Sequence, residues 1–199
     1  MRSSYPLVLA TILAIGAIAC SGSKSGQPYG AGDPALAAAN PAGGPIDPFL
    51  TNGDAVVQAL HDVTSRYPAP LRLTSISAHI SEGLIFDVVL PTDRAHVVRY
   101  IVAPTGKTLG PIAVNLLIGG RPATASDIAI LAFDPATLAF ARLTSAIRDA
   151  IAQSKLPDAR VIQWGLGGAN KHVYVIVNAP SGRRVALFDH QLRFVRMLF

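Results

Sequence analysis

The same order of predicted elements occurs twice along this chain, and that repeat constrains the fold more than any other feature of the sequence. After Asn52, apolar residues at helical spacing predict a helix, and strands rich in β-branched and aromatic residues follow it. A second helix and set of strands come later, with Pro70 set against Pro157 and Tyr100 against Leu187 at one offset of 87 residues (157 − 70 and 187 − 100). Internal duplication explains the common offset. The sequence therefore predicts an α+β protein of two tandem helix-plus-antiparallel-sheet units, each of the αββββ type.

Turns rich in glycine, proline and aspartate divide the predicted strands. The first unit is predicted to cover residues 46–118, with its helix ending near Tyr67-Pro68, and the second unit residues 119–199. The predicted strands are residues 71–80, 84–90, 97–102 and 111–118 in the first unit, and residues 160–164, 172–177, 184–188 and 192–199 in the second.

The second unit is predicted to begin with a helix that Asp134 caps and that runs to Ser154, because Pro135 suits the first helical position. Residues 165–168 have the sequence Gly-Leu-Gly-Gly and predict a turn. They do not predict a phosphate loop, because a strand follows them where an anion site needs the N-terminus of a helix. Residues 129–133 fit either the start of a helix or one more strand, since periodicity does not decide so short a run.

The N-terminus has the pattern of a secretion signal that ends at the only cysteine, Cys20. Arg2 supplies the basic residue, and the apolar run of residues 7–19 leads to small residues before the cysteine. These 13 residues (19 − 7 + 1) reach only about 20 Å as a helix, whereas the hydrocarbon core of a membrane is about 30 Å thick. Residues 1–19 are therefore predicted to be a signal peptide.

This segment resembles the lipobox of bacterial lipoproteins, whose cysteine receives a diacylglyceryl group and becomes the mature N-terminus. Ala17 stands where that family usually has leucine. The resemblance implies lipid attachment at Cys20. Ser21 in place of aspartate implies the outer membrane, with the protein facing the periplasm. Two other interpretations stay open, which are an ordinary signal peptide cut near Ala19 and an uncleaved N-terminal anchor.

Residues 20–45 are predicted to be the lipidated cysteine and a disordered tether. Ser21–Pro45 consists mostly of glycine, serine, alanine and proline, which cannot bury enough apolar surface to fold. As a flexible coil its 25 residues (45 − 21 + 1) have a reach of about 25 to 30 Å. Since no second cysteine exists, no intramolecular disulfide supports the rest of the chain. The fold must depend on a hydrophobic core, for which its length suffices.

Two segments carry a family resemblance. Residues 100–109, with the sequence YIVAPTGKTL, resemble the PepSY domain, in which a strand runs into a Thr-Gly turn and a short following strand. Residues 175–185 have the hairpin of that family, whereas residues 189–192 lack its Thr-Gly. Two such units in tandem are similar to the β-lactamase inhibitory protein, and a lipidated helix-plus-sheet body is similar to the small lipoprotein of the outer-membrane β-barrel assembly machine. These resemblances imply binding rather than catalysis, and PepSY domains are linked with restraining peptidases.

The predicted strands carry hydrophobic residues on both faces, whereas a sheet with one face in water alternates between apolar and polar residues. Phe86 and Val88 share one face, while Ile85 and Val89 flank Asp87 on the other. Either the two sheets cover each other or merge, or the second face is an apolar patch that binds a partner. Trp164 is expected to be a core residue or a sheet-edge anchor. The candidate partner-binding residues on the second face are Asp87, Arg99, Gln163 and Tyr174.

Charge and motifs argue against other classes of function. The formal net charge of +5 is scattered, with Arg183-Arg184 in a turn and Arg193 and Arg196 near the end, so no nucleic acid is expected as a partner. The histidines lack HExxH spacing, and no G-x-S-x-G motif occurs. We therefore expect no bound metal, no cofactor and no catalytic residues, and we do not expect an enzyme.

The sequence thus predicts a protein of the cell envelope that is held to the membrane by its N-terminal lipid and binds another envelope or exported protein. Two roles remain open. In the first, the protein inhibits or regulates a peptidase or other hydrolase. In the second, it is a structural accessory of an outer-membrane assembly or secretion complex.

Overall fold

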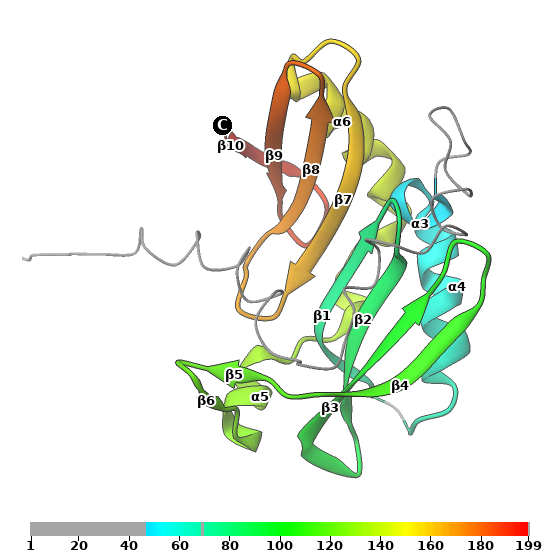
Figure 1. Ribbon diagram of the computed structural model, residues 1–199, viewed down its shortest axis with the longest axis vertical. Helices are drawn as coiled ribbons and strands as arrows, with labels where there is room; N and C mark the ends of the chain where they lie inside the picture. The colour runs from blue at the N-terminus through cyan, green and yellow to red at the C-terminus, as the bar shows by residue number, and fades with distance from the viewer. Residues whose placement is uncertain (1–46, 69, 199) are drawn as a thin grey trace, which may run out of the picture. The chain divides into compact units, whose positions relative to one another are not determined.

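An eight-stranded antiparallel sheet organises the residues that the computed structural model describes, which are residues 47–68 and 70–198 (Figure 1). The predicted signal peptide, Cys20 and tether lie outside the described residues. The strand order is β10-β9-β8-β7-β1-β2-β3-β4. The strands are β1 (Arg72–His79), β2 (Gly83–Leu90), β3 (Asp93–Val102), β4 (Thr108–Val114), β7 (Arg160–Gly167), β8 (Val173–Ala179), β9 (Gly182–Phe188) and β10 (Phe194–Leu198).

The two predicted sets of strands form the two halves of this one sheet. Strands β1–β4 are neighbours in chain order on one side, and β7–β10 are neighbours in chain order on the other. The halves join where β1 pairs antiparallel with β7, with Ser77 opposite Gly165 and Ala78 opposite Trp164. The two sheets therefore merge rather than cover each other. The prediction of an α+β protein is confirmed, and the structure is α+β with one large antiparallel sheet and few helices.

Helices α3 (Pro48–Thr51), α4 (Gly53–Thr64) and α6 (Leu143–Ser154) lie on one face of the sheet (Figure 1). Asn52 caps α4 as predicted, since its side chain accepts hydrogen bonds from the backbone N–H groups of Asp54 and Ala55. The predicted helix end near Tyr67 is three residues too late, because α4 ends at Thr64. Tyr67 instead belongs to the turn that leads to β1.

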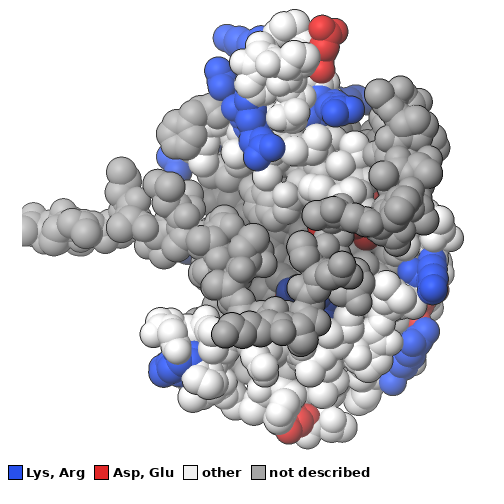
Figure 2. All heavy atoms as spheres, viewed as in Figure 1, with Lys and Arg blue, Asp and Glu red and all other residues white. Residues whose placement is uncertain are grey.

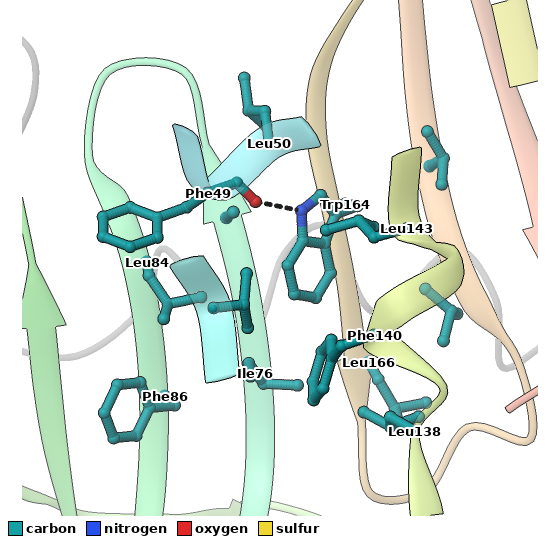
Figure 3. Close-up of a cluster of buried hydrophobic side chains, with 14 of the residues drawn as sticks. Phe49, Leu50, Ile76, Leu84, Phe86, Leu138, Phe140, Leu143, Trp164 and Leu166 are labelled. Carbon is teal, nitrogen blue, oxygen red and sulfur yellow. Dashed lines mark hydrogen bonds between the residues drawn. The ribbon is translucent and has the colours of Figure 1, made fainter. Parts of the chain in front are cut away.

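The core between helices and sheet is centred on Trp164, which is 1% exposed, so its predicted core role is confirmed. Its indole Nε1 donates a hydrogen bond to the carbonyl oxygen of Phe49 at 2.8 Å, and its ring lies 6.1 Å from that of Phe140 (Figure 3). Trp164 thus ties α3 to the strand at which the two halves of the sheet meet. Apolar residues from both halves, including Ile76, line the same core.

The prediction of a helix from Asp134 to Ser154 is wrong in its first turns. Asp134 caps a short 3₁₀ helix, Pro135–Thr137, and α6 begins only at Leu143 after a second 3₁₀ turn. The chain breaks between them because Leu138, in extended conformation, is buried in the core together with Phe140. A local cap signal does not reveal that tertiary requirement.

The predicted turn at residues 165–168 is also wrong, because β7 continues through Gly167. A Cβ atom on Gly165 would lie 2.6 Å from the hydroxyl oxygen of Tyr174 and 2.8 Å from the Cβ of Ser77. The glycine therefore serves to admit a large neighbouring side chain within the sheet rather than to turn the chain.

The remaining differences are in the last strand of each half and between the halves. The strand predicted at residues 111–118 is β4, which ends at Val114, and the strand predicted at residues 192–199 is β10, which begins at Phe194. Between the halves, β5 (Leu117–Ile118) and β6 (Arg121–Pro122) form a small hairpin that precedes helix α5 (Ala125–Leu131). A capping box between Thr124 and Asp127 starts α5 and is a sequence signal that the prediction missed.

Candidate functional site

The candidate site is the face of the sheet opposite α4 and α6, which we call the open face. Along β8, Val173, Val175 and Val177 are buried against the helices, whereas the alternate residues Tyr174 and Ile176 are partly exposed on the open face. Side chains alternate between the two faces along a strand, and residues directly opposite each other on neighbouring strands lie on the same face. The strand register therefore shows which other residues lie on the open face.

The segment between the halves covers one end of the open face in the first half. Ile128 of α5 packs with Val89 and Val97 in a second cluster of buried hydrophobic residues, separate from the main core. The Arg72 guanidinium donates a hydrogen bond to the carbonyl oxygen of Ala132, just after α5. This part of the face, at one end of β2 and β3, is therefore closed within the chain itself.

A buried ion pair occupies the next part of the first half. Asp87 of β2 is opposite Arg99 of β3 and is only 3% exposed. Its carboxylate accepts hydrogen bonds from Arg99 Nε at 2.7 Å, from Arg99 Nη2 at 2.9 Å and from the hydroxyl of Ser75 at 2.9 Å. The Arg99 side chain is 42% exposed, and its hydrogen bond to Asp87 raises the pKa of the guanidinium. Asp87 is thus reachable by a partner only through Arg99.

A second polar pair lies in the other half of the face. The Tyr174 hydroxyl accepts a hydrogen bond from Gln163 Nε2 at 2.9 Å, and the tyrosine crosses the strand β7 where Gly165 leaves room. Burial raises the pKa of Tyr174, while the hydrogen bond from Gln163 lowers it by a smaller amount. This contact holds the tyrosine along the sheet with part of its surface exposed.

The structure therefore places all four candidate residues on the open face, but as two separate pairs. Asp87 and Arg99 lie on β2 and β3, Gln163 and Tyr174 lie on β7 and β8, and strand β1 runs between the pairs. Whether any of the four contacts a partner stays a prediction.

Two rows of side chains on β8–β10 extend the open face beyond the candidates, and only Tyr174 of these rows was among them. Ile176 is opposite Val185, which is opposite Leu198, and Tyr174 is opposite Leu187, which is opposite Arg196. These residues come from consecutive strands, and the strand register determines which side chains are adjacent.

A third row is polar and lies beyond them, where Asn178 has Arg160 on one side and Arg183 on the other. In the sequence these arginines are scattered, and only the fold brings Arg160 and Arg183 together. The strand spacing of about 4.8 Å puts Arg160 and Arg183 only two strands apart on one face. Figure 2 shows that Lys and Arg side chains gather at the end of the view where Figure 1 places the tips of β8 and β9.

Within residues 47–68 and 70–198, no group of three or more histidine, cysteine, aspartate or glutamate side chains is arranged to hold a metal ion. In the same part of the chain, no helix has the length and apolar character needed to cross a membrane.

Comparison with known proteins gives a likeness in fold. No protein-family model matches the chain, and no curated protein sequence matches it. The fold is similar to the crystal structure of a protein from Clostridium difficile 630 described as a putative lipoprotein, with a TM-score of 0.51 and 9% sequence identity. The alignment covers 75% of this chain and 93% of that chain. At this identity the likeness concerns the fold alone.

Proposed function

We propose that this protein is an envelope lipoprotein that binds another envelope or exported protein through the open face of its sheet, and that this binding regulates a peptidase or another hydrolase. The lipid would be attached at Cys20 and would hold the protein on the periplasmic side of the outer membrane. The halves of the sheet would be tandem PepSY-like units, as the sequence resemblance implies.

One observation carries the binding proposal. On β8 and β9, the apolar residues on the face opposite the helices are Tyr174, Ile176, Val185 and Leu187, and all four are partly exposed. Antiparallel sheets that face water on one side normally carry polar residues there. A contiguous apolar surface with polar residues at its rim is typical of a protein interface.

The lipid anchor is supported by the Cys20 signal pattern and agrees with the description of the structurally similar Clostridium protein as a putative lipoprotein. A tether of about 25 residues would keep the protein near the membrane, where a high local concentration increases the occupancy of a weak interface. The regulatory role is supported by the resemblance to PepSY domains, whose known members are linked with restraining peptidases.

The test is site-specific photocrosslinking in native envelopes with the full-length lipoprotein. A benzophenone side chain replaces Leu187 on the open face or, as a matched control, Val57 of α4, which is 49% exposed. We expect one envelope protein to crosslink from position 187 and none from position 57. Equal crosslinking from both positions, or none from position 187, contradicts binding through the open face.

A Cys20→Ala variant then separates the two roles. A regulator that binds its target directly should still inhibit the crosslinked hydrolase when the lipid is absent and the protein is added at micromolar concentration. A structural accessory would lose its effect, because only the membrane brings it to its partner.

A further inference from the structure

We infer that the binding surface is the β7–β10 half of the open face and that it takes an acidic protein segment carrying apolar side chains. The inference rests on the proposed function and adds to it which half binds and the chemistry of the partner.

The centre of this surface is an apolar strip of five side chains from three adjacent strands: Tyr174, Ile176, Val185, Leu187 and Leu198. Each is partly exposed, so each has contact area that a partner can still bury. The Tyr174 ring adds a large, rigid contact surface whose hydroxyl is already hydrogen-bonded to Gln163. We call these five residues the apolar strip.

Three arginines surround the apolar strip. Arg160 and Arg183 lie beside Asn178 at one end, and Arg196 lies on the edge strand β10 opposite Leu187. All three are exposed. Among the described residues, none of the three forms an ion pair within the chain.

No acidic residue balances these arginines on β7–β10, since these strands contain neither aspartate nor glutamate. The nearest acidic residues in the sequence, Asp158 and Asp189, are in the turns beyond the strand ends. Arginine at the rim of an apolar surface complements carboxylates on a partner and donates in a planar fork. The partner segment is therefore expected to carry acidic residues beside apolar ones.

The other half of the open face also carries exposed apolar side chains, since Leu109 is opposite Ile101 and Ile112 is opposite Arg99, but the arginine beside them is paired. Its central arginine, Arg99, is neutralised by Asp87, and one end of β2 and β3 is covered by α5. The two halves thus differ in the unpaired positive charge that they offer a partner, although they share one sheet.

A protein segment fits the apolar strip better than a membrane or a second copy of this chain. Peripheral membrane binding typically uses an amphipathic helix whose apolar face enters the bilayer, whereas the strip residues lie on a sheet and are only partly exposed. A symmetric pairing of two copies through this face would leave the arginines without carboxylate partners, because both copies would present strands that contain neither aspartate nor glutamate.

The experiment uses the full-length lipoprotein in a non-ionic detergent and a fluorescein-labelled peptide in which glutamate alternates with valine and tyrosine. Fluorescence anisotropy measures binding at 50 and 300 mM salt. We expect the Arg183→Glu, Arg196→Glu double variant to bind at least tenfold more weakly than the intact protein. The control variant Arg94→Glu, Arg148→Glu carries the same change of net charge at exposed positions off the strip and should bind within twofold of the intact protein.

A peptide with glutamine in place of glutamate should bind at least tenfold more weakly, and salt should weaken only the glutamate peptide. The inference is overturned if the glutamate peptide does not bind, if both peptides bind equally, or if the two double variants lose equal affinity for the glutamate peptide. If the protein binds no peptide but co-sediments with phosphatidylglycerol–phosphatidylethanolamine vesicles, and this co-sedimentation requires Arg183 and Arg196, the partner is a lipid surface instead. Failure here leaves the proposed function standing if position 187, and not position 57, still crosslinks to one envelope protein.

Discussion

Replacing Arg99 by methionine tests whether a buried ion pair holds the first half of the open face together. Methionine keeps most of the apolar stem and removes the guanidinium that donates to both carboxylate oxygens of Asp87, at 2.7 and 2.9 Å. Asp87 is 3% exposed, so its charge stays out of water with the Ser75 hydroxyl as its remaining side-chain donor. The substitution should therefore destabilise the fold.

The size of the effect follows from the geometry of the pair. Opposite unit charges about 4 Å apart interact by about 4 kcal/mol at an effective dielectric constant of about 20. Breaking a buried pair by removing one partner costs about 3 to 5 kcal/mol. Because the Arg99 side chain is 42% exposed, water weakens the pair, and the lower end applies. We expect the free energy of unfolding to fall by about 3 kcal/mol.

Equilibrium unfolding in urea, followed by circular dichroism, measures this loss. The double variant Asp87→Asn, Arg99→Met leaves no buried charge and should recover most of the stability. The variant Arg94→Met removes an exposed arginine and should change the free energy of unfolding by about 0.5 kcal/mol or less. A loss below about 1 kcal/mol in Arg99→Met, or no recovery in the double variant, refutes the reasoning. A confirmed loss means that Arg99 variants report on folding and that binding tests must use other positions.

Three further substitutions test the core, a buried acid and a close backbone contact. Trp164→Phe removes the indole hydrogen bond to α3 and part of a buried ring, and should lower the free energy of unfolding in urea by about 2 to 3 kcal/mol. Burial raises the pKa of Asp47 to about 6, so the folded state holds a proton that the unfolded state loses above pH 4. Stability should therefore fall by about 2 kcal/mol between pH 4 and 7. In Asp47→Asn this pH dependence of the free energy of unfolding should vanish. If the urea midpoints of the intact protein and of the variant change with pH in parallel, the prediction is wrong. Gly168→Ala places a Cβ 1.5 Å from the carbonyl oxygen of Leu131, whereas in Gly167→Ala the nearest atom is 3.5 Å away. Thermal unfolding should show a clearly lower midpoint for Gly168→Ala than for the intact protein, and no such decrease for Gly167→Ala.

Local signals in the sequence were enough to predict much of the sheet. Strands β2, β3, β8 and β9 were predicted within a few residues, because dense β-branched runs end at turns of glycine, proline or aspartate. The cap at Asn52 likewise predicted the start of α4. The missed helix α5 has only seven residues, so its periodicity is weak, and its capping box was the one available signal.

The parts that sequence reasoning missed depend on contacts between distant residues. The pairing of Ser77 with Gly165 merges the two halves, and no local pattern indicates which strands of two repeats will be neighbours. The candidate site has the same limit. Tyr174 and Arg99 were assigned to one surface from alternation alone, and the structure places both on the open face in different halves. The cluster of arginines around the apolar strip needed the register of β7–β10.

The difference between the two halves is the strongest argument for where a partner binds. A duplicated sheet would by itself present two similar faces, and the face opposite the helices could be water-facing in both. In the first half, the segment with α5 covers Val89 and Val97, and Asp87 neutralises Arg99, so the central charge is satisfied within the chain, although Leu109 and Ile112 of β4 remain 36% and 39% exposed. In the second half, no described segment covers the apolar strip, and its arginines form no ion pairs within the described residues. Partly exposed hydrophobic side chains beside unpaired charge gain stability from a complementary surface, and that gain is the physical basis for binding by β7–β10.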